Sequence, residues 1–139
     1  DHKATRAYTA LVLGHVHPTV GIIDAPIARD SRLPTRMTAS RDGRQARTRY
    51  EVTEQFASSA LLTVELETGR THQIRVHLES IGFPVAGDPT YGKPAFELKR
   101  QFLHASRLSF AHPMAEDQVT VESELPDDLV AALAMARAG

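Results

Sequence analysis

The sequence predicts an α+β fold in which a mainly antiparallel mixed sheet packs with a few helices. Segments with the alternation of strands outnumber segments with helical periodicity, and turn signals between neighbouring strands favour antiparallel pairing. The chain of 139 residues has the length of one domain, and its apolar share of 42% is enough for a buried core.

Strand-like segments account for much of the chain. Arg6–Gly14 is apolar on both faces, because Tyr8, Ala10 and Val12 alternate with other mostly apolar side chains, so we expect this strand to be central. A helical turn is expected at 95–102. Further strands are expected at residues 20–27, 36–40, 45–55, 61–67, 103–111 and 118–124.

One pair of strands has an especially strong turn signal between them. The dipeptide Asp42-Gly43 is typical of a two-residue hairpin turn. We therefore predict that segments 36–40 and 45–55 pair with each other. In the second arm, Arg47 and Arg49 alternate with side chains suited to a core, so one face of the hairpin is expected to pack while the other carries arginine.

Two segments have helical signals. In residues 71–81, Ile74, Leu78 and Ile81 recur at i, i+4 and i+7 and form a stripe that a sheet can bury. A second helix is expected over residues 126–139, because a proline and two acids occupy its first turn.

The composition excludes several classes of function. The chain has no cysteine, which excludes disulfides, thiolate metal sites and cysteine nucleophiles, and which fits a cytoplasmic location. No apolar run approaches the roughly 20 residues that a membrane-spanning helix needs. We therefore expect no membrane association.

The charge is unevenly distributed although the net charge is only −1. Residues 29–49 are rich in arginine, and residues 116–128 are acidic. Arginine suits bidentate contacts to phosphate and stacking on bases, so the basic region is expected to contact an RNA backbone, although any single arginine is more simply a solvated surface residue. The arginines of this region are Arg29, Arg32, Arg36, Arg41, Arg44, Arg47 and Arg49.

Hydrogen-bond donors are crowded where the 71–81 helix is expected to begin. Arg70, Thr71, His72 and Gln73 stand together at a helix N-terminus, which favours anions. Thr71 also suits a simple N-cap. Arg70 and His72 are equally well explained as RNA contacts and as supports of a nearby site.

Two segments of this sequence closely resemble the signature of RluA-type RNA pseudouridine synthases. They are Gly69-Arg70-Thr71-His72-Gln73-Ile74-Arg75-Val76-His77 and Gly87-Asp88-Pro89-Thr90-Tyr91-Gly92. Arg6-Ala7-Tyr8-Thr9-Ala10-Leu11-Val12-Leu13-Gly14 is similar to the strand that carries the active-site tyrosine in that family. The similarity continues in order to about Leu129, through Leu103-His104-Ala105 and Ala111-His112-Pro113.

The resemblance implies an enzyme that isomerises uridine to pseudouridine in structured ribosomal or transfer RNA without a cofactor or metal. It implies two catalytic residues here. Tyr8 would lie against the target base and assist proton transfer. Arg75 would pair with the nucleophilic aspartate. The simpler alternatives are a core role for Tyr8 and an i,i+4 ion pair between Arg75 and Glu79. The residues expected to bind RNA are Arg36, Arg44, Arg47, Arg49, Arg70 and His72.

The sequence also departs from the family pattern. The His-Arg-Leu-Asp segment that carries the family's nucleophile does not occur in these residues. The resemblance therefore implies that residues 1–139 are the C-terminal part of one catalytic domain, inactive alone, that lacks its N-terminal half and associates with itself through an exposed sheet. Asp88, between Gly87 and Pro89, is assigned to its own turn instead.

Two other functions remain open at this point. The chain could be a non-catalytic RNA-binding domain. It could also hydrolyse RNA phosphates through His72 and His77. A zinc site at these histidines is disfavoured, because residues five apart on a helix point in different directions, whereas metal-binding helices use i,i+4.

Overall fold

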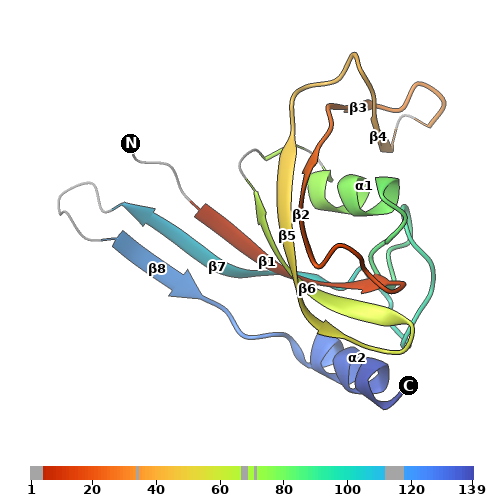
Figure 1. Ribbon diagram of the computed structural model, residues 1–139, viewed down its shortest axis with the longest axis vertical. Coiled ribbons are helices and arrows are strands. Elements are labelled where there is room, and N and C mark those ends of the chain that lie inside the picture. Colours follow the sequence, from red (N-terminus) through yellow and green to blue (C-terminus); the bar gives the residue numbers. More distant parts are fainter. Residues whose placement is uncertain (1–4, 34, 67–68, 71, 112–117) are drawn as a thin grey trace.

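The computed structural model describes residues 5–33, 35–66, 69–70, 72–111 and 118–139, and it confirms the α+β class (Figure 1). A six-stranded antiparallel sheet has the order β2-β5-β6-β1-β7-β8, and a small sheet pairs β3 with β4. The strands of the large sheet are β1 (Thr5–Leu13), β2 (Val20–Asp24), β5 (Arg47–Gln55), β6 (Ser59–Leu66), β7 (Leu103–Ala111) and β8 (Gln118–Glu122). The other elements are β3 (Ile27–Arg29), β4 (Met37–Ala39), α1 (Gln73–Ser80) and α2 (Asp127–Ala138).

β1 is central, as its two apolar faces predict. It pairs with β6 on one side and with β7 on the other, and Ala10, Leu11 and Val12 are fully buried. Because successive side chains alternate between faces, Ala10 and Val12 belong to one core cluster and Leu11 to another.

A helix covers each face of this sheet. On the α1 face, Ile74 and Leu78 of the predicted buried stripe belong to the same core cluster as the β1 and β6 side chains, whereas Ile81 follows the end of α1 and is exposed. On the α2 face, Leu129 and Leu133 pack against Leu11. The β7–β8 hairpin extends away from both helices (Figure 1). The sheet therefore has a covered half and an uncovered half.

The predicted pairing of segments 36–40 and 45–55 is wrong. β4 pairs with β3, and β5 pairs with β2 and β6. The chain does turn at Asp42-Gly43, but the two arms of this turn enclose Ile27, which bridges to Ala39 on one side and to Arg44 on the other. A Cβ at Gly43 would lie 2.4 Å from the Ile27 carbonyl carbon, so glycine is needed here for close approach of the backbone.

Two smaller predictions also need correction. Segment 95–102 forms no helical turn, because Phe96 and Glu97 have φ values of 51° and 57° and make a tight turn between Ala95 and Leu98. The helix predicted from residue 71 begins at Gln73 with His72 as its N-cap, and Thr71 lies outside the described residues.

β2 and β8 are the edge strands of the large sheet. Each leaves apolar side chains exposed, namely Val20 and Ile22 on β2 and Val121 on β8. Unpaired edges of this kind can pair with another chain, and self-association of the chain remains a prediction. Neither α1 nor α2, the helices of the described residues, is long and apolar enough to span a bilayer.

α1 is joined to β5 by a buried polar network around His77, which is fully buried. The ring Nε2 lies 2.8 Å from the Ala25 carbonyl oxygen, so Nε2 carries a proton and donates it. Nδ1 then accepts the hydroxyl of Thr48 at 2.7 Å, while the Thr48 oxygen accepts from Gln73. Burial lowers the pKa of His77, and this outweighs the opposing effects of Ala25 and Asp24.

We predict that acid destabilises the fold through His77. The unfolded chain binds a proton at this residue below pH ~6.5, whereas the folded chain stays neutral to a lower pH. The free energy of unfolding should therefore fall as the pH drops below ~6.5, by up to about 1.4 kcal/mol per pH unit for this group. Urea unfolding between pH 7.5 and 5.5 measures the slope. His77→Gln should flatten it, and the exposed His15→Gln should not. Equal slopes in all three proteins would contradict the prediction.

Candidate active site

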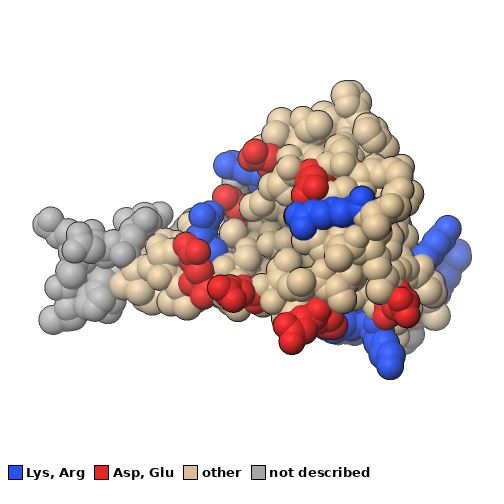
Figure 2. Space-filling model, turned by 90° about the horizontal axis from the view of Figure 1, so that it is seen from below, with Lys and Arg blue, Asp and Glu red and all other residues tan. Residues whose placement is uncertain are grey.

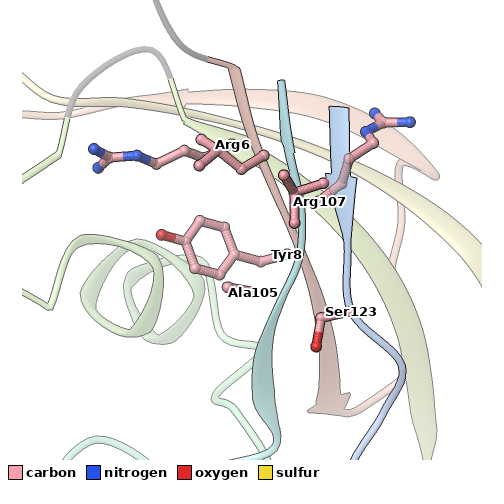
Figure 3. Close-up of a pocket in the computed structure, with 7 residues that line it drawn as sticks. Arg6, Tyr8, Ala105, Arg107 and Ser123 are labelled. Atoms are coloured by element: carbon pink, nitrogen blue, oxygen red, sulfur yellow. The ribbon is translucent and has the colours of Figure 1, made fainter. Parts of the chain in front are cut away.

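Tyr8 stands at a hollow in the uncovered half of the sheet. Its register partner on β7 is the small residue Ala105, and Ser123, another small residue directly after β8, also lines the hollow. The next row, beside Arg6, holds the larger residues Leu108 and Val121. Together they border a pocket of about 270 Å³ (Figure 3).

A β-bulge shapes this hollow. The β1–β7 register shifts between Ala7 and Tyr8, so that Ala7 pairs with Arg107 while Tyr8 pairs with Ala105. The extra residue Ser106 donates its hydroxyl to the Ala7 carbonyl at 3.2 Å. Bulges commonly re-aim side chains next to functional sites. Here the bulge keeps a small residue beside the Tyr8 ring.

Arg75 makes a bidentate ion pair with Asp88. Its Nε lies 2.6 Å from Oδ2 and its Nη2 lies 2.8 Å from Oδ1. The Asp88 side chain is 0% exposed and that of Arg75 only 11%. Burial alone would raise the pKa of Asp88, but the bonds from Arg75 and from the N–H groups of Tyr91 and Thr90 outweigh it, so the net pKa is lowered. The bond to Asp88 in turn raises the pKa of Arg75.

This geometry corrects one expectation about Arg75 and confirms one about Asp88. The i,i+4 alternative is wrong, because Glu79 pairs with Arg36 at 2.6 Å. The pairing of Arg75 with a nucleophilic aspartate stays a prediction, and Asp88 binds the edge of the guanidinium that Nε and Nη2 form. The predicted role of Asp88 in its own turn is confirmed, because Oδ1 accepts the N–H groups of Thr90 and Tyr91.

Tyr91 is the hub of this cluster, and it is buried. The guanidinium carbons of Arg36 and Arg75 lie over its ring, 4.9 and 5.0 Å from the centroid. Its hydroxyl accepts the Met37 N–H at 2.7 Å and lies 2.8 Å from Nδ1 of His72. The hydroxyl can donate to Nδ1 in the tautomer with the ring proton on Nε2, and it can accept from Nδ1–H in the other.

His72 is held in an uncommon conformation. As the N-cap of α1 it has φ 54° and ψ 20°, in the left-handed region, and its side chain caps no helix N–H. Instead the ring packs edge-on against Tyr91. Burial and the Arg75 charge lower its pKa, against an opposing effect of Asp88. The left-handed backbone at His72 therefore directs the imidazole into the cluster.

The structure brings some of the predicted RNA-binding residues together and separates others. Arg36 and His72 join Arg75 at Tyr91. Arg70 lies just before α1 and donates to the Gln45 carbonyl at 2.9 Å, next to the exposed Arg44.

Arg47 and Arg49 lie on the other side of the sheet. They alternate with the buried Thr48 and Tyr50, so they project from the opposite face of β5. Arg47 lies 3.7 Å from Asp24 there. Seen from the side on which α2 lies, acidic and basic side chains are interspersed (Figure 2).

Sequence reasoning missed the partners that organise this site. It treated residues 84–92 as a loop defined by backbone geometry and overlooked Tyr91. It also left Arg6 without a role. One signal was available for Tyr91, because its segment and that of His72 occur together in the family signature. Among the described residues, no three His, Asp or Glu side chains converge as a metal site would require.

Comparison with known proteins identifies the family. The family model described as RNA pseudouridylate synthase matches residues 1–80. The chain is 47% identical over 130 residues to the uncharacterized RNA pseudouridine synthase YlyB of Bacillus subtilis, covering 93% of this chain and 43% of that protein. It is 49% identical over 137 residues to ribosomal large subunit pseudouridine synthase D of Nitrosomonas europaea, covering 92% and 40%.

Solved structures agree. Human RNA pseudouridylate synthase domain containing 1 is 30% identical with a TM-score of 0.77, over 88% of this chain and 55% of that one. Human RNA pseudouridylate synthase domain containing 4 is 25% identical with a TM-score of 0.77, over 96% and 62%. The chain spans less than half the length of the two curated relatives. On the family model and these identities, the chain belongs to the RNA pseudouridylate synthase family.

Proposed function

We propose that the natural gene product containing this chain isomerises uridine to pseudouridine in structured RNA. The observation that carries the proposal is that Tyr8 and α1 lie on the same face of the large sheet. Tyr8 packs against the same core cluster as Ile74 of α1, and Arg75 is the next residue of that helix. The two side chains that the family resemblance marks as catalytic thus come from distant segments to one side of the sheet. Ribosomal RNA is the favoured substrate, because one relative is named for it.

Each residue has a defined task in this proposal. The half-buried Tyr8 presents a ring that can stack on a base and a hydroxyl that can relay a proton. Arg75 has one edge fixed by Asp88, which leaves Nη1 for a second acceptor. A guanidinium placed there lowers the pKa of an incoming carboxylate and orients it. That carboxylate would be the aspartate of a His-Arg-Leu-Asp segment, which assists glycosidic cleavage before C5 of the freed uracil is joined to C1′.

Substrate access imposes a further requirement. A uridine in a helix must leave its stack before it reaches the pocket beside Tyr8, at a cost of a few kcal/mol. Contacts between the protein and the RNA backbone must offset this cost. We propose that Arg36, Arg44, Arg70 and His72 contribute here, because they lie in segments beside α1.

The first test compares the natural gene product with the 139-residue chain. The gene product should convert uridine to pseudouridine in ribosomal RNA isolated from cells that lack the gene. The chain alone should not, because these residues contain no His-Arg-Leu-Asp segment. Release of tritium from C5-labelled uridine measures the reaction. RNA binding by the gene product without any conversion would instead favour a non-catalytic RNA-binding domain.

The second prediction concerns the pair of Arg75 and Asp88. Asp88→Asn keeps an oxygen for the Thr90 and Tyr91 N–H groups but removes the charge that holds Arg75. It should cost about 3 kcal/mol of stability, because a buried guanidinium loses its partner. Arg75→Met should lower kcat roughly 10²–10³-fold, the scale for one preorganised donor.

A double-mutant cycle separates the two roles. If Asp88 acts through Arg75, then Asp88→Asn should lower kcat in the natural gene product and have little further effect in the Arg75→Met background. Additive losses of kcat would show that Asp88 acts independently. An unchanged kcat in Arg75→Met would remove Arg75 from the catalytic residues.

The third prediction uses the separation of the arginines by face. Replacing Arg44 and Arg70 with glutamine should weaken RNA binding and reduce the salt slope of log K by about 0.7–0.9 per lost phosphate contact. Replacing Arg47 and Arg49, on the opposite face, is the matched control with the same change in charge. Filter binding at several salt concentrations measures both slopes. A larger effect of the Arg47 and Arg49 replacements would indicate that RNA binds on the α2 face instead.

A further inference from the structure

Arg6 lies beside Tyr8 in a position that the proposed reaction does not yet use. The two residues are two apart on β1 and therefore project from the same face. Figure 3 shows the Arg6 side chain and the Tyr8 hydroxyl extending in the same direction from the sheet, and both residues line the pocket. The Arg6 side chain is exposed at the pocket mouth.

No described carboxylate pairs with Arg6. Several arginines elsewhere in the described residues, such as Arg36, Arg75 and Arg100, have such partners. Arg107, which pairs with Ala7 on the neighbouring strand, has its guanidinium 3.7 Å from Glu65. Arg107 also lines the pocket, but Figure 3 shows its guanidinium on the other side of the sheet from that of Arg6. Arg6 is thus a cation at the pocket whose charge no described acid neutralises.

The Arg6 guanidinium also reaches the segment that leads into α1. Its Nη1 lies 3.5 Å from the position that a Cβ would occupy on Gly69. Gly69 directly precedes Arg70 and stands three residues before His72, the N-cap of α1. Arg6 therefore spans the distance between the strand of Tyr8 and the loop before the catalytic helix.

The rest of the pocket suits a flat, uncharged group. Leu108 and Val121 are exposed apolar residues, and they form a cross-strand pair beside Arg6. Ala105 and Ser123 leave space next to the Tyr8 ring. The volume of about 270 Å³ lies just below the ~300–1,000 Å³ usual for small-molecule sites, so the pocket suits one nucleotide better than a duplex.

We propose that Arg6 binds the RNA backbone phosphate adjacent to the nucleotide whose base enters this pocket. The proposal rests on the proposed function and adds a positioning and affinity residue to it. An aromatic ring with an apolar floor receives the base, and a guanidinium at the mouth receives the phosphate in bidentate geometry. By fixing the phosphate, Arg6 holds the displaced nucleotide in register with Tyr8 and α1.

The test uses Arg6→Gln, Arg6→Lys and Arg107→Gln in the natural gene product. Arg6→Gln should raise KM for RNA about tenfold at low salt with kcat little changed, and it should reduce the salt slope by about 0.7–0.9, the value for one phosphate contact. Arg6→Lys should keep the salt slope because it keeps the charge. Arg107→Gln is the matched control, with the same change in charge on the opposite face, and should leave KM and the slope unchanged.

A modified substrate identifies the phosphate. Neutral methylphosphonates are placed one at a time on either side of the target uridine. One of them should weaken binding to the unmodified protein as much as Arg6→Gln does, and it should add nothing to the Arg6→Gln variant. Thermal unfolding of each variant shows whether it still folds. If Arg6→Gln does not fold, Arg6→Lys is compared with the unmodified protein instead.

The outcomes separate this proposal from the proposed function. If the unmodified gene product forms no pseudouridine, the function fails, and the salt slopes of binding still test Arg6. If pseudouridine forms but Arg6→Gln has the KM and slope of Arg107→Gln, Arg6 contacts no phosphate. Additive effects of Arg6→Gln and both methylphosphonates would overturn the proposal as well.

Discussion

The buried ion pair between Arg75 and Asp88 is the constraint on which the site depends. It joins α1 to the loop that follows, and the N–H groups of Thr90 and Tyr91 complete the coordination of the carboxylate. Two buried charges require this geometry, because desolvation would otherwise outweigh their attraction. Since the pair fixes the loop, it also fixes Tyr91. The ring then provides the surface over which Arg36 lies and the hydroxyl that His72 meets.

The sheet explains why the site is open on one side. α1 and α2 cover the β1–β6 half, where the buried side chains lie, and leave the β7–β8 half uncovered. Tyr8 stands at the boundary, with Val64 of β6 beside it on one side and Ala105 of β7 on the other. A phenol placed there packs against the core and stays half-buried, and it borders the pocket. This arrangement combines a rigid scaffold with an accessible polar group.

The features that the sequence predicted correctly depend on local patterns. The alternation around Tyr8 predicted a central strand, and the spacing of Ile74 and Leu78 predicted the buried face of α1, because both periods follow from backbone geometry alone. The failures depend on contacts between distant residues. Asp42-Gly43 does turn the chain, but only the insertion of Ile27 decides what the two arms pair with.

Net charge is a poor guide to anion binding in this molecule. Most of the arginines with a described partner are matched to a single acid, as Arg100 is to Asp128 and Arg137 is to Glu54, and such pairs are nearly neutral beyond a Debye length. The potential at the pocket therefore depends on cations such as Arg6, which pairs with no acid among the described residues. For anion binding at this pocket, the placement of the Arg6 guanidinium beside Tyr8 consequently matters more than the net charge of −1.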